Sequence, residues 1–338
     1  MAAQYAKDLP SDTSNFIQNV AIVGVSGTIG SFITKEILKI GKQTLTAITR
    51  EGSTSSVPDG VNVATINYDD PSSITKALKG QQVLIITLPT RPPEGTSKKL
   101  IEAAAEAGVE YVLPNEYGPD LVGRPEMGLE TGIGAAVMRD VALIEKLGVS
   151  NRIGLVSGFW YQYSLIINPN AFGFDFKNKR ATFCDDGLTK INISTWDQSG
   201  RALAKLFSLP ILPQDENDKQ PVLSQWKNKA CHISSFYISQ HDMLDSVLRV
   251  TGDSKEDWSI EYVPSQERYQ QGKEMMSNGS DFFGGYVRCM YTRVFYKDGS
   301  GDFNDQLDNE KLGLPHESLD EATKDAMDMI KSGWSYYK

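Results

Sequence analysis

Three glycines stand at every third position in the segment 24–30, which reads GVSGTIG. The segment follows an apolar, β-branched run at 20–23 and precedes apolar residues at helical spacing, so we predict a buried strand, a tight turn and a helix. Gly24 permits the turn, Gly27 lets the backbone approach a ligand, and Gly30 lets the helix pack closely against the strand. The start of that helix would present free N–H groups and a positive dipole end to a phosphate. The segment therefore predicts a site for the pyrophosphate of a dinucleotide, with a glycine turn that holds no ligand as the alternative.

The end of the second predicted strand bears on which dinucleotide binds. An acidic residue there accepts hydrogen bonds from the ribose 2′-hydroxyl of NAD, whereas an arginine favours the 2′-phosphate of NADP. Here the strand 45–48 is followed by Thr49 and Arg50, and a guanidinium can hold a phosphate through two parallel hydrogen bonds. Glu51 could weaken this preference, and Arg50 could instead be a solvated strand end. We predict NADP(H) as the cofactor and leave NAD(H) open.

Later strand ends supply further candidate contacts. Asp69 follows a third strand at 61–66, and it could accept from the adenine amino group or cap the helix that begins near Pro71. A fourth strand ends at Thr87, and the residues beyond it should lie under the cofactor at the carboxyl edge of the sheet. The predicted cofactor contacts are Gly24, Ser26, Gly27, Thr28, Ile29, Gly30, Thr49, Arg50, Asp69, Thr87, Leu88, Pro89 and Asn115.

The elements that position these residues alternate along the first half of the chain. Strand and helix patterns follow the order β-α-β-β-α-β-α-β up to residue 113. A Gly/Pro-rich loop at 118–134, a helix at 135–147 and a sixth strand at 153–156 come next. This rhythm predicts an α/β fold, a Rossmann-type, doubly wound parallel sheet with helices on both faces.

The second half of the chain carries weaker signals. Helices are predicted near 198–207, 240–251 and 318–331, with short strand candidates among them. We expect a smaller mixed α+β substrate region that also returns some strands to the sheet. The expected division of the chain is an N-terminal extension (1–18), a dinucleotide-binding domain (19–157) and a substrate-binding region (158–338).

Composition limits the possible partners. The 338 residues carry 34 basic and 43 acidic side chains, a net charge of −9, without a basic block that could follow a phosphate backbone, so we expect no nucleic-acid surface. No apolar run approaches the ~20 residues of a membrane span, and the polar first residues lack the apolar core of a secretory signal. Three cysteines and three histidines are too scattered to predict a metal site or a disulfide framework. We expect a cytoplasmic monomer or homodimer whose partner is a small-molecule substrate.

Several segments together resemble a known family. The chain is similar to the NmrA-like, isoflavone-reductase-like branch of the atypical short-chain dehydrogenases, and within it to the fungal CipA-like isoflavone reductase family. The resemblance runs over nearly the whole chain from about Asn19 and implies NADPH-dependent reduction of small, often aromatic, metabolites of secondary metabolism. The segments that show this resemblance are GVSGTIG at 24–30, TAITRE at 46–51, NYDDP at 67–71, VEYVLPNEYGPD at 109–120, GFDFKNK at 173–179 and TKINISTW at 189–196.

Two features of related enzymes are missing here. Short-chain dehydrogenases commonly use a YxxxK pair, and the one such spacing, from Tyr269 to Lys273, lies so far downstream that we interpret it as coincidental. Isoflavone-type reductases place a lysine at the start of the helix before the sixth strand, but Val137 and Met138 stand there instead. The usual catalytic lysine is therefore absent, or another residue performs its proton transfer.

Tyr117 is the first candidate for that task because it lies just beyond the fifth strand, where the ligands of such sheets bind. Tyr161 and Lys177 are further candidates. The alternatives are that Tyr117 is a packing residue with a polar tip and that Lys177 is a solvated charge. Phe159, Trp160 and Tyr161, together with Tyr117, are predicted to line an apolar substrate pocket, unless they simply pack in the core.

The leading hypothesis for function is an NADPH-dependent reductase of a carbonyl, enone or imine in a small hydrophobic, aromatic metabolite. The alternative is a non-catalytic, NmrA-like regulator that senses dinucleotides and acts through a protein partner. The missing lysine favours the regulator, while the aromatic residues after the sixth strand favour the enzyme.

Overall fold

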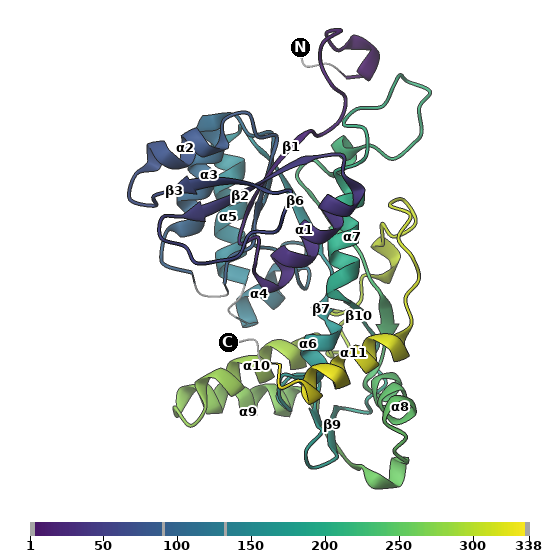
Figure 1. Cartoon of the computed structure of the whole chain (residues 1–338). Helices are drawn as coiled ribbons and strands as arrows, with labels where there is room; N and C mark the ends of the chain where they lie inside the picture. The colour runs from purple at the N-terminus through teal and green to yellow at the C-terminus, as the bar shows by residue number, and fades with distance from the viewer. Residues whose placement is uncertain (1–3, 90–91, 132–133, 335–338) are drawn as a thin grey trace.

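A seven-stranded parallel sheet forms the centre of the N-terminal half (Figure 1). The computed structural model describes residues 4–89, 92–131 and 134–334. Every strand pairing in this sheet is parallel, which confirms the predicted Rossmann-type architecture. In spatial order the strands are β11 (Lys229–His232), β6 (Asn151–Val156), β5 (Tyr111–Leu113), β4 (Val83–Ile86), β1 (Asn19–Val23), β2 (Thr44–Arg50) and β3 (Asn62–Ile66).

The strand order reverses at β1, which pairs with β2 on one side and with β4 on the other. The connections after β1 and β4 therefore leave toward opposite faces and open a crevice at the carboxyl edge, the place where such sheets bind ligands. Val20, Ile22 and Ile85 are fully buried, as expected for central strands covered on both faces.

Helices cover both faces of the sheet. α1 (Thr28–Ile40) and α7 (Trp196–Leu206) pack together on one face, while α2 (Pro71–Leu78), α3 (Thr96–Ala107) and α5 (Gly134–Leu147) cover the other (Figure 1). Gly200 allows the close contact of α7 with α1, because a Cβ on it would lie 2.5 Å from the carbonyl oxygen of Phe32. The second half of the chain thus contributes both a helix and the strand β11 to the Rossmann layers.

The rest of the second half forms a smaller mixed α+β region below the sheet in Figure 1. It has two three-stranded sheets, β12–β10–β7 and β13–β9–β8. Their strands are β7 (Phe159–Trp160), β8 (Phe174–Asp175), β9 (Arg180–Cys184), β10 (Ile191–Ser194), β12 (Phe236–Ile238) and β13 (Ser259–Val263). The helices are α6 (Tyr161–Ile166), α8 (Gln240–Thr251), α9 (Ser265–Ser277), α10 (Phe282–Arg293) and α11 (Leu319–Lys331).

Four α-helices lie where the sequence did not predict them, α6 among them. α4 (Pro125–Thr131) interrupts the expected loop at 118–134, and α9 and α10 form an antiparallel-looking pair in the lower part of Figure 1. Glycine has a low helix propensity, which hides such helices from sequence analysis. Here Gly272 and Gly285 let the two helices meet, since a Cβ on Gly285 would lie 2.5 Å from the carbonyl oxygen of Gly272.

Short 3-10 helices complete the secondary structure, at Ala6–Asp8, Leu223–Trp226, Lys255–Asp257 and Asn304–Gln306. The first of them belongs to the N-terminal segment, which docks on the segment around Leu212. The Asn15 side chain donates to the Leu212 carbonyl at 2.8 Å and accepts from its N–H at 2.9 Å.

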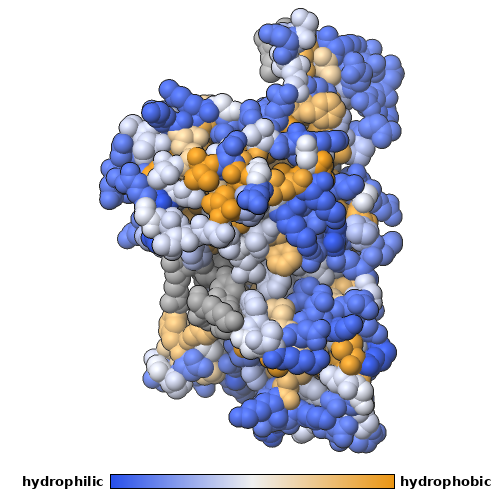
Figure 2. Space-filling view, in the orientation of Figure 1, coloured by the Kyte–Doolittle hydropathy of each residue, from blue (hydrophilic) through white to orange (hydrophobic). Residues whose placement is uncertain are grey.

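Apolar residues gather on the upper half of the view in Figure 2, whereas the lower half is mainly hydrophilic. Val63 on β3 is an exposed apolar residue, with 57% of its surface accessible. No helix within the described ranges is both long enough and apolar enough to span a bilayer. The three cysteines are free and buried.

A buried ion pair joins the end of β5 to β6. The guanidinium of Arg152 lies 2.6 Å from the carboxylate of Glu116, and the two side chains are only 5% and 1% exposed. Gly154 makes room for the pair, because a Cβ there would lie 2.5 Å from a Glu116 carboxylate oxygen. Two desolvated charges of this kind depend on each other.

We predict that Glu116→Gln lowers the free energy of unfolding by about 3–5 kcal/mol, because it leaves the Arg152 charge buried without its counter-ion. Urea unfolding followed by circular dichroism measures the change. The control is Asp328→Asn, which breaks an exposed pair with Lys331 and should cost less than about 1 kcal/mol. Equal, small losses in both variants would show that the buried pair does not hold β5 and β6 together.

Candidate functional site

The glycine turn after β1 is closed against the end of β4. Gly24 has a φ of +83°, and a Cβ on it would lie 2.1 Å from the carbonyl oxygen of Thr87. The Thr87 hydroxyl donates to the Val23 carbonyl at 2.7 Å, which ties the two strand ends together. Glycine is therefore required at position 24 by both backbone conformation and space.

The first turn of α1 is open for an anion. A Cβ on Gly30 would lie 2.1 Å from the Gly24 carbonyl oxygen, so the helix start packs directly on the turn. Gly27 is the N-cap residue and no side chain caps the helix. Ser26 and Gly27 are exposed and Thr28 is partly exposed, while Ile29 is buried beneath them. Uncapped N–H groups and the helix dipole together suit a pyrophosphate.

Arg50 ends β2 with an exposed side chain beside the end of β3. Its guanidinium forms no ion pair with the residues that the structure describes, Glu51 included. Its neighbour is Tyr68. Burial raises the pKa of Tyr68, and the nearby Arg50 charge partly offsets this shift. With Thr49 partly buried behind it, Arg50 is free to meet a 2′-phosphate.

Asp69 is not the cap of α2. The N-cap is Asp70, whose carboxylate accepts from the Ser72 N–H at 3.0 Å. The Asp69 side chain is 95% exposed and lies 3.8 Å from the Lys99 ammonium. The capping alternative for Asp69 is therefore wrong, and its role toward adenine stays a prediction.

Asn115 holds the loop that follows β4. Its side chain accepts from the Leu88 N–H at 3.2 Å and donates to the Leu88 carbonyl at 3.1 Å. This reciprocal pair fixes Leu88, and with it the exposed Pro89, at the carboxyl edge. The geometry gives Asn115 a positioning role toward the predicted cofactor site.

Tyr117 lies just beyond β5 with a buried hydroxyl that has no hydrogen-bond partner in the described part of the chain. The residue is 7% exposed and shares a buried cluster with Val25 and Ile29 of the glycine turn and α1. Burial raises its pKa above the ordinary tyrosine value, and the Glu116 charge adds to this shift. An unpartnered buried hydroxyl is costly, and the role of Tyr117 as a proton donor stays a prediction.

The predicted aromatic lining divides between two cores. Phe159 and Tyr161 point into the core of the C-terminal region, where Phe159 stacks on Tyr291 at 3.9 Å. Trp160, the residue between them, packs instead against the cluster that contains Tyr117. Side chains alternate along an extended strand, so the three consecutive aromatics cannot share one pocket.

Two of the proposed proton donors lie away from the crevice. Tyr161 is fully buried in the core of the C-terminal region, away from the predicted cofactor edge. Its hydroxyl forms a hydrogen bond with the Thr323 hydroxyl at 2.7 Å. Lys177 is exposed in the turn between β8 and β9, outside the seven-stranded sheet. The geometry favours packing for Tyr161 and solvation for Lys177 over the catalytic roles predicted from sequence.

The expected lysine position and the YxxxK spacing have structural explanations. Val137 and Met138 lie on α5, and Val137 is buried against the C-terminal core. Tyr269 lies on α9, and its hydroxyl donates to the Glu130 carbonyl at 2.7 Å, with the Lys273 ammonium 6.0 Å from the ring centre. The hydrogen bond from Tyr269 to Glu130 therefore links α9 to α4.

Sequence analysis missed two groups, one at the end of β11 and one at the start of α7. His232 at the end of β11 lies 3.4 Å from the Asp120 carboxylate that follows β5. The pKa of Asp120 is lowered, because the hydrogen bonds from His232 and the Gly123 N–H outweigh the opposite effect of burial. Trp196 at the start of α7 stacks on Phe32 at 5.5 Å and, like Trp160, has an indole N–H without a partner in the described residues. No sequence motif marks either group, because only the sheet order and the packing of α7 on α1 bring them to the edge.

These features test whether NADP(H) fits. Gly24 and Gly30 form a cradle that any Cβ would fill, the helix start is uncapped, and Arg50 is unpaired within the described chain. The buried Tyr117 hydroxyl also has no hydrogen-bond partner among the described residues. The glycine cradle, the uncapped helix start and Arg50 are appropriate for a phosphorylated dinucleotide.

Comparisons with known proteins agree with this geometry. The oxidoreductase aprR of Aspergillus flavus is 24% identical over 319 residues, covering 89% of this chain and 96% of that protein. The solved structure of AtPrR2 with NADP+ and (+)pinoresinol has a TM-score of 0.72 and 18% identity, covering 92% of this chain and 99% of that chain. A crystal structure of isoflavone reductase has a TM-score of 0.70 and 20% identity, covering 93% and 99%.

Residues 17–123, which contain the glycine turn, Arg50 and Tyr117, match the model of the NmrA-like family. The dinucleotide-binding half of the chain is thus similar to the NmrA-like family, and the fold of the chain is that of the isoflavone-reductase-like proteins.

Proposed function

We propose that the chain is an NADP(H)-dependent reductase of a small, hydrophobic, aromatic metabolite that carries a carbonyl, enone or imine. One juxtaposition carries the proposal: a glycine turn with no room for a Cβ and the unpartnered Tyr117 hydroxyl meet at one sheet edge. The similarity to the oxidoreductase aprR and to the structure of AtPrR2 with NADP+ supports it.

Reduction by hydride transfer also requires a proton donor. NADPH, when bound, supplies a hydride to the electrophilic carbon of the substrate. Negative charge then develops on the substrate oxygen or nitrogen, and the Tyr117 hydroxyl would transfer its proton to that atom and regain one from solvent. Its raised pKa keeps the hydroxyl protonated, and its burial strengthens the bond that it makes.

Aromatic side chains that belong to or pack against the same buried cluster as Tyr117 favour an aromatic substrate. Trp160 and Trp196 lie 6.2 Å apart between ring centres, and Phe32 stacks on Trp196. Flat rings such as these bind a planar ligand by stacking or edge contact, and the unpartnered indole N–H groups offer donors to its polar atoms.

The alternative proposal is a regulator that senses the dinucleotide and acts through a protein partner. One observation favours it: Val137 and Met138 occupy the place where isoflavone-type reductases carry lysine. A regulator needs the cofactor cradle but has no use for a buried proton donor, so variants of Tyr117 separate the two proposals.

We predict that Arg50→Ala raises the Kd of NADPH by about 10- to 100-fold, the worth of a charge-assisted hydrogen bond, and changes the Kd of NADH by less than about twofold. Fluorescence titration of the reduced nucleotides measures both constants. Arg180→Ala, which removes an exposed arginine from β9, is the control and should change neither. Equal losses for NADPH and NADH would remove the argument for a 2′-phosphate contact.

We predict that Tyr117→Phe lowers kcat by about 10²- to 10⁴-fold, as expected for a positioned proton donor, while leaving stability unchanged or higher because it deletes an unpartnered hydroxyl. Tyr161→Phe is the matched control. It should keep kcat and lose about 1 kcal/mol of stability, because it removes the bond to Thr323. Turnover of an active carbonyl or enone acceptor and thermal unfolding supply the two readouts. Unchanged turnover in Tyr117→Phe would exclude this residue as the proton donor.

A further inference from the structure

The hydroxyl of Thr87 lies between the glycine turn and the first turn of α1. It donates to the Val23 carbonyl at 2.7 Å and to the Gly24 carbonyl at 3.1 Å, so the two carbonyls share its single proton. A Cβ on Gly24 would lie 2.6 Å from this hydroxyl oxygen, and a Cβ on Gly30 would lie 2.8 Å from it. One side chain at the end of β4 therefore lies against both glycines that shape the predicted phosphate site.

The Gly24 carbonyl also binds the residue that begins α1. It accepts a hydrogen bond from the Gly27 N–H at 2.9 Å. Gly27 is the N-cap of α1, and its own carbonyl accepts the first helical hydrogen bond, from the Ser31 N–H at 2.8 Å. Because the Gly27 N–H is used inside the turn, an anion at this helix start is left with the N–H groups that follow it. Their direction depends on where the Gly24 carbonyl is held.

The contacts of Thr87 favour an indirect role over the direct cofactor contact predicted from sequence. The residue is only 7% exposed. Its hydroxyl is used by the Val23 and Gly24 carbonyls, and its backbone N–H also donates to the Val23 carbonyl, at 3.0 Å. Its donors therefore act on the glycine turn rather than on the crevice.

We propose that Thr87 is a positioning residue for NADP(H). Its hydroxyl fixes the Gly24 carbonyl, and through it the start of α1 against which the pyrophosphate binds. This role rests on the NADP(H) binding of the proposed function, but not on proton donation by Tyr117. The pyrophosphate is common to NADPH and NADH, so loss of the hydroxyl weakens both nucleotides alike, whereas loss of Arg50 weakens only NADPH.

Thr87→Val tests the proposal because it removes the donor and keeps a side chain of similar shape. A methyl carbon needs more room against an oxygen than a hydrogen-bonded hydroxyl does, so the Gly24 carbonyl must shift. The variant should still fold, because the Val23 and Gly24 carbonyls keep the backbone N–H groups of Thr87 and Gly27. Fluorescence titration should show the Kd of NADPH and the Kd of NADH each raised by about 3- to 10-fold. Thr87→Ser keeps the hydroxyl, and both constants should stay within about twofold of those of the unmodified chain.

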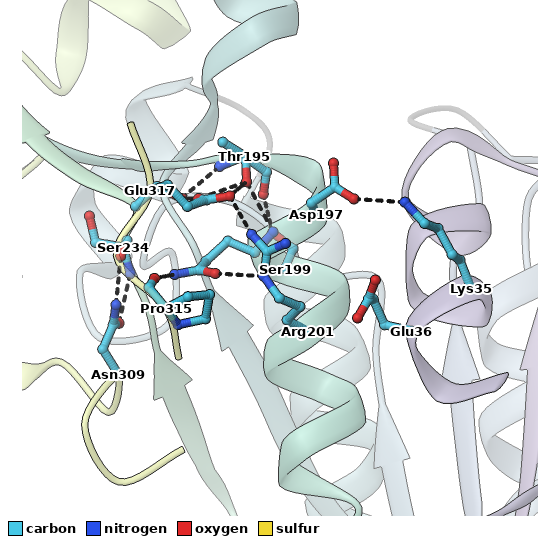
Figure 3. A network of polar contacts seen from close by, with 12 residues as sticks. Lys35, Glu36, Thr195, Asp197, Ser199, Arg201, Ser234, Asn309, Pro315 and Glu317 are labelled. Carbon is cyan, nitrogen blue, oxygen red and sulfur yellow. Dashed lines mark hydrogen bonds and ion pairs between the residues drawn. The ribbon is translucent and has the colours of Figure 1, made fainter. Parts of the chain in front are cut away.

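Thr195 provides the matched control, as a second buried threonine whose hydroxyl holds a helix start (Figure 3). Its hydroxyl accepts from the Gln198 N–H at 3.0 Å as the N-cap of α7 and donates to the Glu317 carboxylate at 2.9 Å. α7 packs on α1, where Asp197 pairs with Lys35 at 3.0 Å. The hydrogen bonds of Thr195 within the described chain do not reach the glycine turn. Thr195→Val should therefore lower the Tm and leave both Kd values unchanged.

Three outcomes would overturn the proposal. The first is an unchanged Kd for both nucleotides in Thr87→Val, which would make the hydroxyl only a link between β1 and β4. The second is a loss confined to NADPH, which would assign the effect to the 2′-phosphate. The third is an equal loss in Thr87→Ser or in Thr195→Val, which would indicate a general loss of order.

Two further arms keep the test decisive. If Thr87→Val does not fold, Thr87→Ala takes its place, because it removes the hydroxyl without setting a carbon atom against the carbonyls, and the same Kd changes are expected. Failure of the unmodified chain to bind either nucleotide would contradict the cofactor of the proposed function, and the role of Thr87 with it.

Discussion

The close contact between the β1 turn and the end of β4 is the constraint on which the rest of the site depends. Gly24, Gly30 and Thr87 meet with no space for another carbon atom. This contact sets the start of α1, and with it the direction of the uncapped N–H groups. It lies where the strand order reverses, so the helix start faces a crevice rather than a neighbouring loop.

In the proposed function the same edge is also the reaction site, because two cores meet there. β7 carries Phe159 into the C-terminal core and Trp160 toward the core of the Rossmann half. The packing of α7 on α1 then brings Trp196 beside Trp160, near the cluster that holds Tyr117. The proposed phosphate cradle, proton donor and aromatic rings thus come from elements far apart in sequence, and only the folded sheet brings them together.

The sequence predicted the features that arise from local pattern. The three-residue glycine spacing, the apolar strands and the arginine after β2 each identify their place without tertiary information. Features that depend on packing were not predictable. Phe159 and Trp160 face different cores, which the prediction of one lining formed by three consecutive aromatic residues did not consider. The helices α9 and α10 were not predicted because they contain glycines, which here allow the two helices to pack closely.

The most direct test of the central claim is a fluorescence titration of the unmodified chain with NADPH, NADP+, NADH and NAD+ under identical conditions. A reductase built on this crevice should bind NADPH most tightly and oxidise it when an enone, ketone or imine acceptor is added. Preferential binding of the oxidised nucleotides, without NADPH oxidation by any of these acceptors, would contradict the account and favour a dinucleotide-sensing regulator.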